Sequence, residues 1–206
     1  MNARAQVLRW TWLTTAALVL GGTATVCAQP PRKTEFAVKR IEVRFERPPV
    51  QGGGSTGRGA REAGQIPWGI FECEFDSQPE WADDVELKWY VVLAGPRAKT
   101  MATGNDIYLY VKKGRRHVAG MFMHPHVLER WTGSTGQSTI EDIGVEIWWQ
   151  GRLVSFSSMR SQARTQWWQQ FTPQPGLLMR ASESPWILGG FTDYEWSKFT
   201  TSKTAQ

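Results

Sequence analysis

The apolar and polar positions of this chain alternate with a period of two over several stretches, which is typical of half-buried β-strands. The clearest stretch is Val85–Leu93, in which every second residue is apolar. A similar run covers residues 34–45, but its apolar positions change phase at Lys39-Arg40. This phase change predicts a β-bulge or a switch between two sheets, because a shift of one residue turns the apolar side chains to the opposite face.

A third alternating run, Trp68–Phe75, places Cys73 on its apolar face. We therefore expect the Cys73 thiol to act as a small core residue. A turn is expected around Pro79, and a further strand over 177–180. Two hairpins are predicted from X-Gly links between β-rich runs. They join 107–111 to 115–122 through Lys113-Gly114, and 145–149 to 153–156 through Gln150-Gly151.

Helical spacing of apolar residues occurs in two places. A short helix is predicted over 125–131, with Gly133 as its stop. A second helix is predicted near 159–171, because its apolar and amide positions recur at helical spacing and Pro173 follows it. The segment that follows is irregular, and residues 201–206 carry no apolar pattern, so we expect a disordered tail there.

These elements predict a mainly β fold: an immunoglobulin-like antiparallel β-sandwich with one C-terminal helix and an irregular C-terminal segment. A parallel α/β fold is disfavoured, because crossover helices are missing between the strands. The expected organisation is a signal peptide over 1–28 and a single sandwich domain over 29–200. The Gly-rich loop 51–64 has no Gly-Lys-Ser/Thr motif, so it does not predict a phosphate site.

The first 28 residues have the features of a secretory signal peptide. Arg4 and Arg9 precede an apolar stretch, 13–26, that is too short to span a bilayer. Small residues before the mature start favour cleavage after Ala28. The alternative is lipidation of Cys27, which would attach the protein to a membrane. We expect an exported protein, in the periplasm or at the cell surface.

Composition and charge narrow the choice of partners. The chain has 206 residues and a formal charge of +5, and loss of residues 1–28 removes Arg4 and Arg9 and leaves +3. Such a small excess argues against a nucleic-acid partner. Of the two cysteines, Cys73 alone would remain, so no intramolecular disulfide can form. No pattern in the sequence predicts a cofactor.

Several short blocks carry a resemblance to a known family. They are Trp81–Tyr90, the pair Trp167-Trp168, the strand Leu177–Arg180, and Ser184–Trp186 with Tyr194 and Lys198. In these blocks the chain, from about Lys33 to Lys198, resembles small exported proteins of verrucomicrobial bacteria, some of which are linked to pilus-like gene clusters. The resemblance implies an immunoglobulin-type sandwich and a role in surface fibres or adhesion. It brings no catalytic residues.

The histidines offer one candidate metal site. His124 and His126 are separated by one residue and could chelate a metal ion. A catalytic zinc site needs a third ligand, and the remaining histidine, His117, lies in the predicted basic hairpin. The alternative is a turn or helix start in which the two imidazoles are solvated or act as caps.

A pair of carboxylates offers a candidate hydrolase site. Glu72 and Glu74 share one face of a predicted strand, about 7 Å apart by strand rise, which is within the range used by glycosidases. Alternating polar faces of sheets produce such pairs often. A solvated sheet surface is therefore the favoured interpretation, and a hydrolase is the third functional hypothesis.

A basic run after two tyrosines is a candidate contact surface. Tyr108 and Tyr110 precede Lys112, Lys113, Arg115 and Arg116. Cations and aromatic rings in this order could contact a ligand or a protein partner. Charge at a hairpin tip also keeps that tip in water and protects a strand edge, which is the alternative interpretation.

The twelve tryptophans pose the last question. Trp89 and Trp167 lie on predicted core faces. In the doublets Trp148-Trp149 and Trp167-Trp168, one ring of each must lie away from the main core. Trp148 and Trp168 are therefore candidate contact residues, or else they close a secondary core beneath the helix.

These observations predict an exported, non-enzymatic β-sandwich protein of the cell envelope that acts through protein contacts or self-assembly, in pilus assembly or adhesion. The alternative is a carbohydrate-binding module that uses exposed Trp and Tyr. A coplanar row of exposed rings would favour a glycan, whereas an apolar patch beside an open sheet edge would favour a protein partner.

Overall fold

The computed structural model describes residues 34–48, 66–160, 165–188 and 197–198, all of which belong to the unit Lys33–Gln206. The predicted signal peptide, the Gly-rich loop 51–64 and the tail 201–206 lie outside these residues, so those predictions are not tested by the structure.

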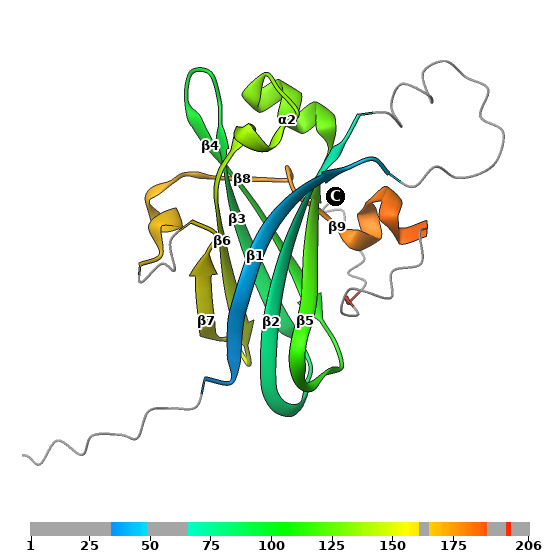
Figure 1. Ribbon diagram of the computed structural model, residues 1–206. Helices are drawn as coiled ribbons and strands as arrows, with labels where there is room; N and C mark the ends of the chain where they lie inside the picture. Colours follow the sequence, from blue (N-terminus) through cyan, green and yellow to red (C-terminus); the bar gives the residue numbers. More distant parts are fainter. Residues whose placement is uncertain (1–33, 49–65, 161–164, 189–196, 199–206) are drawn as a thin grey trace, which may run out of the picture. The chain divides into compact units, whose positions relative to one another are not determined.

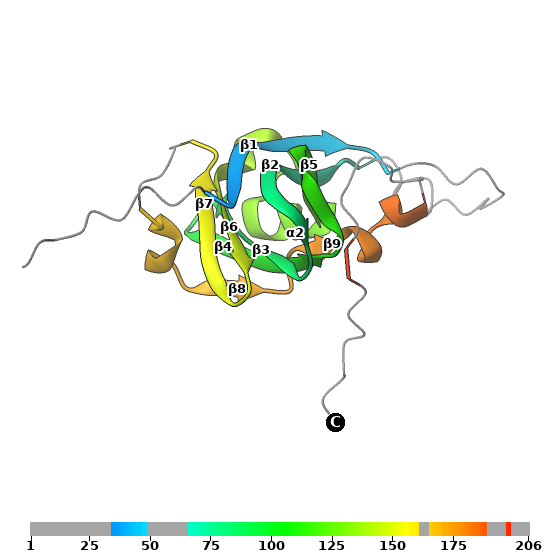
Figure 2. The same cartoon turned by 90° about the horizontal axis from the view of Figure 1, so that it is seen from below.

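The described residues form two sheets that pack face to face (Figure 1, Figure 2). The first sheet has the order β1-β2-β5-β9 and the second has the order β7-β6-β3-β4-β8. The bounds are β1 Phe36–Glu46, β2 Trp68–Ala82, β3 Val85–Ala94, β4 Lys99–Tyr108, β5 Val111–Met123, β6 Ile140–Trp149, β7 Arg152–Ser158, β8 Pro173–Pro175 and β9 Met179–Arg180. Neighbouring strands are antiparallel, except that β8 is parallel to β4. The predicted mainly β sandwich is confirmed.

The main core lies between the sheets, where the inward-facing residues of the alternating runs meet. Trp89 of β3 is fully buried there, together with Phe71, Cys73 and Phe75 of β2. Burial raises the pKa of the Cys73 thiol well above its ordinary value, so this group stays protonated and apolar. Its predicted role as a core residue is confirmed.

The pairing of β1 with β2 confirms one prediction, and the length of β2 corrects another. The register shifts between Val38 and Arg40, where the phase of the sequence changes. The turn predicted at Pro79 is wrong, because β2 continues to Ala82. Its pairing with β5 is irregular between Ser77 and Trp81. A bulge tolerates proline because the missing N–H is not needed for the ladder.

One of the two predicted hairpins is confirmed. Gln150 and Gly151 link β6 to β7 with φ of 52° and 73°, as in the type I′ turns that favour hairpins. The hairpin predicted at Lys113-Gly114 is wrong, because both residues lie inside β5. The chain turns earlier, between β4 and β5, where Tyr110 adopts a φ of 59°. Glycine adopts such a φ without cost. Because no glycine stands at this position, the sequence pattern did not predict this turn.

The short helix predicted over 125–131 is confirmed as α2 (Pro125–Thr132). The His124 side chain caps its start, and Gly133 ends it with a φ of 74°. Leu128 is buried in the main core, so α2 closes one end of the sandwich. Short 3-10 turns complete the described chain: η1 Gln137–Thr139, η2 Trp167–Gln170, η3 Ala181–Glu183 and η4 Pro185–Leu188. None of the helices in the described ranges has the length and apolar character needed to cross a membrane.

The helix predicted near 159–171 is wrong in its described part. Residues 161–164 lie outside the described chain, and 167–170 form the single 3-10 turn η2. The residue that this segment buries is Trp168 and not Trp167, which the helical spacing had placed on the core face. Trp168 and Phe171, three residues apart, both pack on the outer face of the second sheet, beside Val92 and Met101.

Residues 165–180, called the strap below, cross from one sheet to the other. The strap packs η2 on the second sheet and pairs β8 with β4. It then joins the first sheet by pairing β9 with β5. The strand predicted over 177–180 is thus confirmed only at Met179–Arg180. Figure 2 shows β8 on the second layer and β9 beside β5.

Candidate functional site

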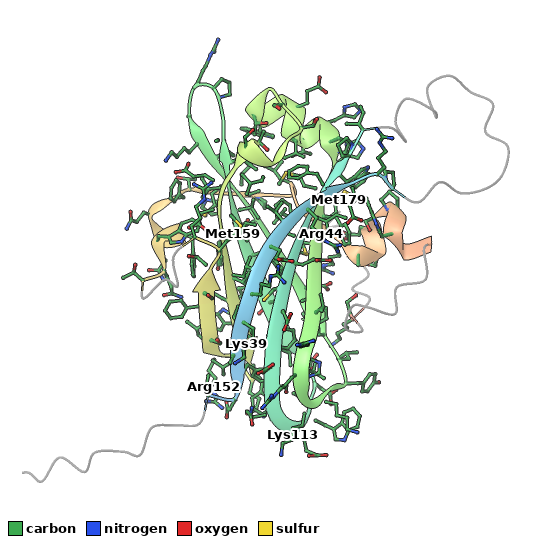
Figure 3. All side chains as sticks on the ribbon, viewed as in Figure 1. Lys39, Arg44, Lys113, Arg152, Met159 and Met179 are labelled. Carbon is green, nitrogen blue, oxygen red and sulfur yellow. The ribbon has the colours of Figure 1, made fainter. Side chains whose placement is uncertain are left out.

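Three residues of the predicted contact set meet at the end of the sandwich opposite α2, where β2 turns into β3 and β4 into β5. They are Tyr110, Lys112 and Lys113, and Trp81 of β2 joins them (Figure 3 labels Lys113). Trp81 pairs with Lys112 across the strands, and the Lys112 Nζ lies 5.6 Å from the centre of its ring. We call Trp81, Tyr110, Lys112 and Lys113 the tip surface.

The two aromatic residues of the tip surface are unusually exposed. Trp81 is 57% exposed and Tyr110 is 65% exposed, and they are the large apolar side chains that lie open in the described chain. Single exposed apolar residues are common on proteins. Two large rings beside cations are instead typical of residues that contribute most to protein contacts.

The backbone of Tyr110 is strained. A positive φ is an outlier for a bulky side chain and costs about 1–3 kcal/mol. A hydrogen bond offsets part of this cost, because the Tyr110 N–H donates to Asp83 Oδ1 at 2.9 Å. The exposed ring gains little from burial, so packing inside the sandwich does not explain this conformation.

The turn between β2 and β3 is held from the far end of the chain. Asp84, with a φ of 52°, accepts a hydrogen bond from Lys198 Nζ at 2.9 Å. The backbone N–H of Lys198 also donates to the Ile107 carbonyl. Residues distant in sequence therefore fix the two turns that carry the tip surface.

The rest of the predicted basic run lies along β5. Arg115 and Arg116 are exposed, and Arg116 lies 4.0 Å from Glu74. Among the described residues, no ion pair of Lys113 or Arg115 is found. Tyr108 is buried between the sheets, so the contact with a ligand or partner predicted for it is wrong.

A buried carboxylate organises the aromatic residues on the outer face of the second sheet. Glu146 of β6 is 4% exposed and accepts four hydrogen bonds from neutral donors. The sheet supplies Tyr90 Oη at 3.1 Å and Trp148 Nε1 at 2.8 Å. The strap supplies Gln166 Nε2 at 2.6 Å and Trp168 Nε1 at 2.8 Å. Glu146 therefore joins the strap to the sheet.

Trp168 fills a secondary core, as the alternative interpretation expected, although it does so from a 3-10 turn. It is 2% exposed and stacks on Tyr90 with an angle of 13° between the rings. A Cβ on Gly144 would lie 2.4 Å from the Trp168 ring, so only glycine allows this fit. The contact role predicted for Trp168 is therefore wrong.

The remaining doublet tryptophans take intermediate positions. Trp148 is half-buried, with the Lys88 Nζ 4.1 Å from the centre of its ring. The prediction that Trp167 faces the core is only partly met, because Trp167 is half-buried at the edge of the secondary core.

Burial and the neighbouring Glu146 carboxylate raise the pKa of Tyr90, so its hydroxyl stays protonated and donates.

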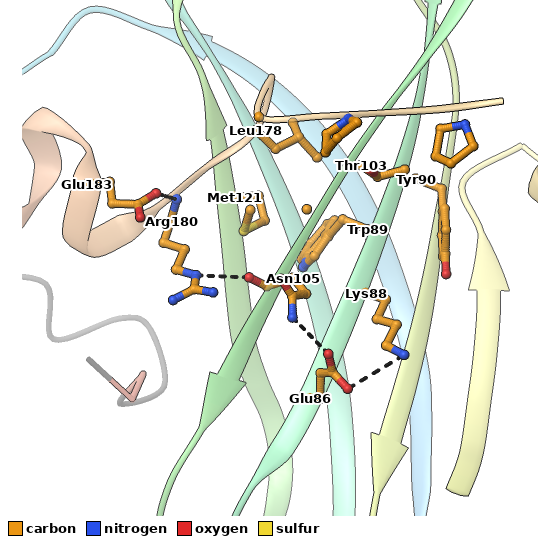
Figure 4. Close-up of a pocket in the computed structure, with 14 residues that line it drawn as sticks. Glu86, Lys88, Trp89, Tyr90, Thr103, Asn105, Met121, Leu178, Arg180 and Glu183 are labelled. Carbon is orange, nitrogen blue, oxygen red and sulfur yellow. Dashed lines mark hydrogen bonds and ion pairs between the residues drawn. The ribbon is translucent and has the colours of Figure 1, made fainter. Parts of the chain in front are cut away.

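A groove lies between the outer face of β3 and β4 and the strap (Figure 4). Its volume is about 670 Å³. Asn105 Nδ2 donates to Glu86 Oε1 at 2.8 Å, and Lys88 lies 3.7 Å from the same carboxylate. Across the groove, Arg180 Nε donates to the Asn105 carbonyl at 3.0 Å. Tyr90 and Pro173 separate it from a second hollow of about 520 Å³.

The histidine pair is arranged as a helix cap. His124 Nδ1 accepts a hydrogen bond from the His126 N–H at 3.1 Å, which confirms the capping interpretation for His124. Burial and the nearby His126 lower the pKa of His124. His126 faces Glu129 at 3.6 Å. The described residues contain no group of three or more His, Cys, Asp or Glu that could hold a metal ion.

The candidate carboxylate pair is part of an ion-paired surface. Glu72 contacts Arg44 of β1, and Glu74 faces Arg116 of β5. Both carboxylates point away from the core on β2. This arrangement agrees with the solvated sheet surface that the sequence favoured.

Two important residues were missed in the sequence. Trp81 precedes the two aspartates of a tight turn, which was the signal that could have placed it beside Tyr110. Glu146 stands alone within the apolar run Val145–Trp149. A single carboxylate on the same strand face as Trp148 was the available signal for a buried hydrogen-bonding centre.

The fold and these sites define a two-sheet β-sandwich with an exposed aromatic tip and a strapped outer face. One protein-family model matches residues 29–196. Because the match spans most of the chain, the chain belongs to the family that this model describes. No curated protein matches it. A crystal structure of a protein from Akkermansia muciniphila is similar in fold, with a TM-score of 0.68 and 16% identity over 84% of this chain and 98% of that chain. Its source is a verrucomicrobial bacterium, in agreement with the resemblance found in the sequence.

Proposed function

We propose that this chain is an exported protein of the cell envelope that acts through protein contacts, in pilus assembly or adhesion, and is not an enzyme. The observation that carries the proposal is the tip surface, where Trp81 and Tyr110 are exposed beside Lys112 and Lys113. Trp and Tyr are the side chains that most often dominate protein interfaces.

The strain at Tyr110 supports this assignment. A glycine would adopt its φ of 59° without cost, and the ring contributes little to the interior. Unfavourable backbone conformations are concentrated at functional sites, where a partner benefits from the fixed geometry. A ring held rigidly before contact loses little entropy when a partner binds.

The family match supports export. It begins at residue 29, directly after the predicted cleavage at Ala28. A mature chain that starts there would contain the whole matched region. The proposed location is the periplasm or the cell surface, and lipidation of Cys27 would add a membrane attachment.

The groups considered for catalysis support binding rather than chemistry. The carboxylates of Glu72 and Glu74 face arginines on the outer side of β2, as in ion pairs that stabilise a sheet surface. The Cys73 thiol is fully buried, and a reactive thiol needs access and a lowered pKa.

Site-specific photocrosslinking in the native host tests the proposal. A photoreactive phenylalanine analogue placed at Trp81 or Tyr110 should give a discrete crosslinked band that mass spectrometry identifies as an envelope protein or a second copy of this chain. The matched control is the same analogue at Arg40, an exposed position on the outer face of the first sheet, which should give no such band. Equal labelling from all three positions, or a chain confined to the cytoplasm, would contradict the proposal.

A further inference from the structure

We propose that the groove between the β3–β4 face and the strap binds a neutral oligosaccharide. This site is separate from the tip surface and goes beyond the proposed protein contact. It is lined from β3 by Glu86, Lys88 and Tyr90 and from β4 by Thr103 and Asn105. Pro173, Pro175 and Gly176 of the strap border it along the edge of β4. A volume of about 670 Å³ lies within the range of small-molecule sites.

Trp89 borders this groove from the core side of β3. Trp89 is fully buried, and among the described residues its indole Nε1 has no hydrogen-bond partner. The indole has no exposed surface, so a ligand in the groove would not touch its N–H, and the ring would report binding through the neighbouring Gly104. Trp89 lies opposite Gly104 on β4, and Figure 4 shows its indole among the lining residues, with Met121 on one side and Lys88 on the other.

The charges of the lining favour a neutral ligand. Lys88 and Arg180 contribute two cations, and Glu86 and Glu183 contribute two carboxylates. A polyanion would therefore meet as many like charges as opposite ones. A sugar hydroxyl both donates and accepts, so it can bond to the carboxylates and to the amide of Asn105 alike.

The polar side chains are held in place before any ligand arrives. Glu86 is fixed from two sides, by Asn105 and by Lys88. The backbone N–H of Arg180 donates to Glu183 Oε2 at 3.1 Å, which orders the other side of the groove. Such preorganisation reduces the entropy lost on binding.

A peptide is disfavoured as the occupant of this groove. Peptides that bind sandwich sheets commonly add a strand to an open edge. Here β8 already pairs with Met101, Ala102 and Thr103 of β4, and Arg180 takes the carbonyl of Asn105. The groove therefore offers side chains rather than a strand edge.

The second hollow extends the site along the sheet. It lies beyond Tyr90 and Pro173, and its lining includes the amides of Gln166 and Gln169, the Glu146 carboxylate, and the rings of Trp148, Trp168 and Phe171. Amides and aromatic rings suit further sugar units. A linear chain could therefore run from one hollow to the other past Tyr90.

Calorimetry with cellohexaose, maltohexaose and chitohexaose tests the proposal, together with ¹H–¹⁵N spectra of the indole N–H groups. At least one oligosaccharide should bind and shift the Trp89 indole signal, which a Trp89→Phe variant assigns. Asn105→Ala and Thr103→Val should each weaken binding about tenfold, because each removes a hydrogen-bonding group worth about 1–2 kcal/mol. Lys113→Ala, at the tip surface, should bind as well as the wild type.

Three results would overturn the proposal. These are the absence of binding by all three oligosaccharides at millimolar concentration, binding of heparin or of a peptide in place of them, or binding that Asn105→Ala and Thr103→Val leave unchanged. Thermal unfolding of each variant shows whether it is folded. Asn105 is exposed and Thr103 is half-buried, so both variants should fold, and a loss of affinity can be told apart from a loss of folding. Loss of tip crosslinks with sugar binding retained would refute the proposed function alone.

Discussion

The outer faces of the two sheets are stabilised in different ways. On the first sheet, Glu72 and Glu74 of β2 face arginines of β1 and β5, so this part of the face is stable in water. On the second sheet, Tyr90, Val92 and Met101 would expose a large apolar area, and the strap covers them with Trp168. The first face is complete within its strands, whereas the second depends on a segment that follows the strands in the chain.

This difference indicates that aromatic burial, and not ion pairing, holds the strap on the sheet. Ion pairs between exposed groups contribute about 0–1 kcal/mol each, because water screens them. Burial of a large aromatic ring contributes several times as much. We therefore expect substitutions on the strapped face to have large effects, and equivalent substitutions on the ion-paired face to have small ones.

The largest effect is expected for Trp168→Ala. Removal of a ring that is 2% exposed leaves a cavity beside Gly144. Tyr90 loses its stacking partner and Glu146 loses one hydrogen-bond donor. Such truncations cost about 3–5 kcal/mol. Urea unfolding followed by far-ultraviolet circular dichroism measures the change. Trp81→Ala, at the exposed tip, is the matched control and should change stability by less than about 0.5 kcal/mol. Equal effects of the two substitutions would show that the strap is not a structural cover.

A smaller loss is expected for Glu146→Gln. The amide keeps the shape of the carboxylate but brings an NH₂ group toward N–H donors, so at least one donor from Trp148, Trp168 or Gln166 loses its acceptor. Each buried unsatisfied group costs about 1–3 kcal/mol, and we expect a total of about 2–4 kcal/mol. The near-ultraviolet circular dichroism of the tryptophans should change together with the unfolding midpoint. An unchanged spectrum at unchanged stability would contradict the role of Glu146 as the join between strap and sheet.

The free energy of unfolding should depend on pH because of a buried carboxylate at the far end of the strap. Asp106 of β4 is 1% exposed and lies 3.8 Å from Arg180, yet burial raises its pKa to about 6. The folded protein therefore holds this proton more tightly than the unfolded chain does, and the stabilisation is fully present below pH 3.8 and lost as the pH rises through about 6.

Asp106→Asn should remove that loss. At pH 7.5 we expect this variant to be more stable than the wild type by about 1–2 kcal/mol, because a neutral amide avoids the cost of a buried charge. Below pH 4 the difference should vanish. Unfolding midpoints between pH 3.5 and 7.5 measure the effect. A variant that is less stable at pH 7.5 would show that the Arg180 contact outweighs the burial of the carboxylate.

The sequence predicted the parts of this fold that local patterns determine. Alternation located β1, β3 and the start of β2, and the phase change at Lys39-Arg40 located the bulge. The strap could not be predicted in the same way, because Trp168 is buried by Gly144, and its indole is bonded by Glu146, more than twenty residues earlier in the chain. The helical spacing near 159–171 had the wrong backbone, and it placed Trp167 on the core side where the structure buries Trp168.

The candidate site was likewise predicted only where its residues are neighbours in the sequence. Tyr110, Lys112 and Lys113 were predicted because aromatic and basic residues stand together in the sequence. Trp81 was not, because it joins them only through the pairing of β2 with β5. The turn at Tyr110 was missed because its φ of 59° depends on a hydrogen bond to Asp83, which belongs to another turn.

The smallest effect is expected on the ion-paired face, for Arg44→Ala. Arg44 contacts Glu72 and lies 3.0 Å from Glu46, and its side chain is about half exposed. Solvent screening limits these pairs, so we expect a loss of less than about 1 kcal/mol at low salt. The difference from the wild type should shrink further in 1 M sodium chloride, where the Debye length is about 3 Å. A loss comparable to that of Trp168→Ala, unaffected by salt, would mean that the ion pairs hold β1 on the sheet as firmly as the strap holds the opposite face, and the contrast between the two faces would then fail.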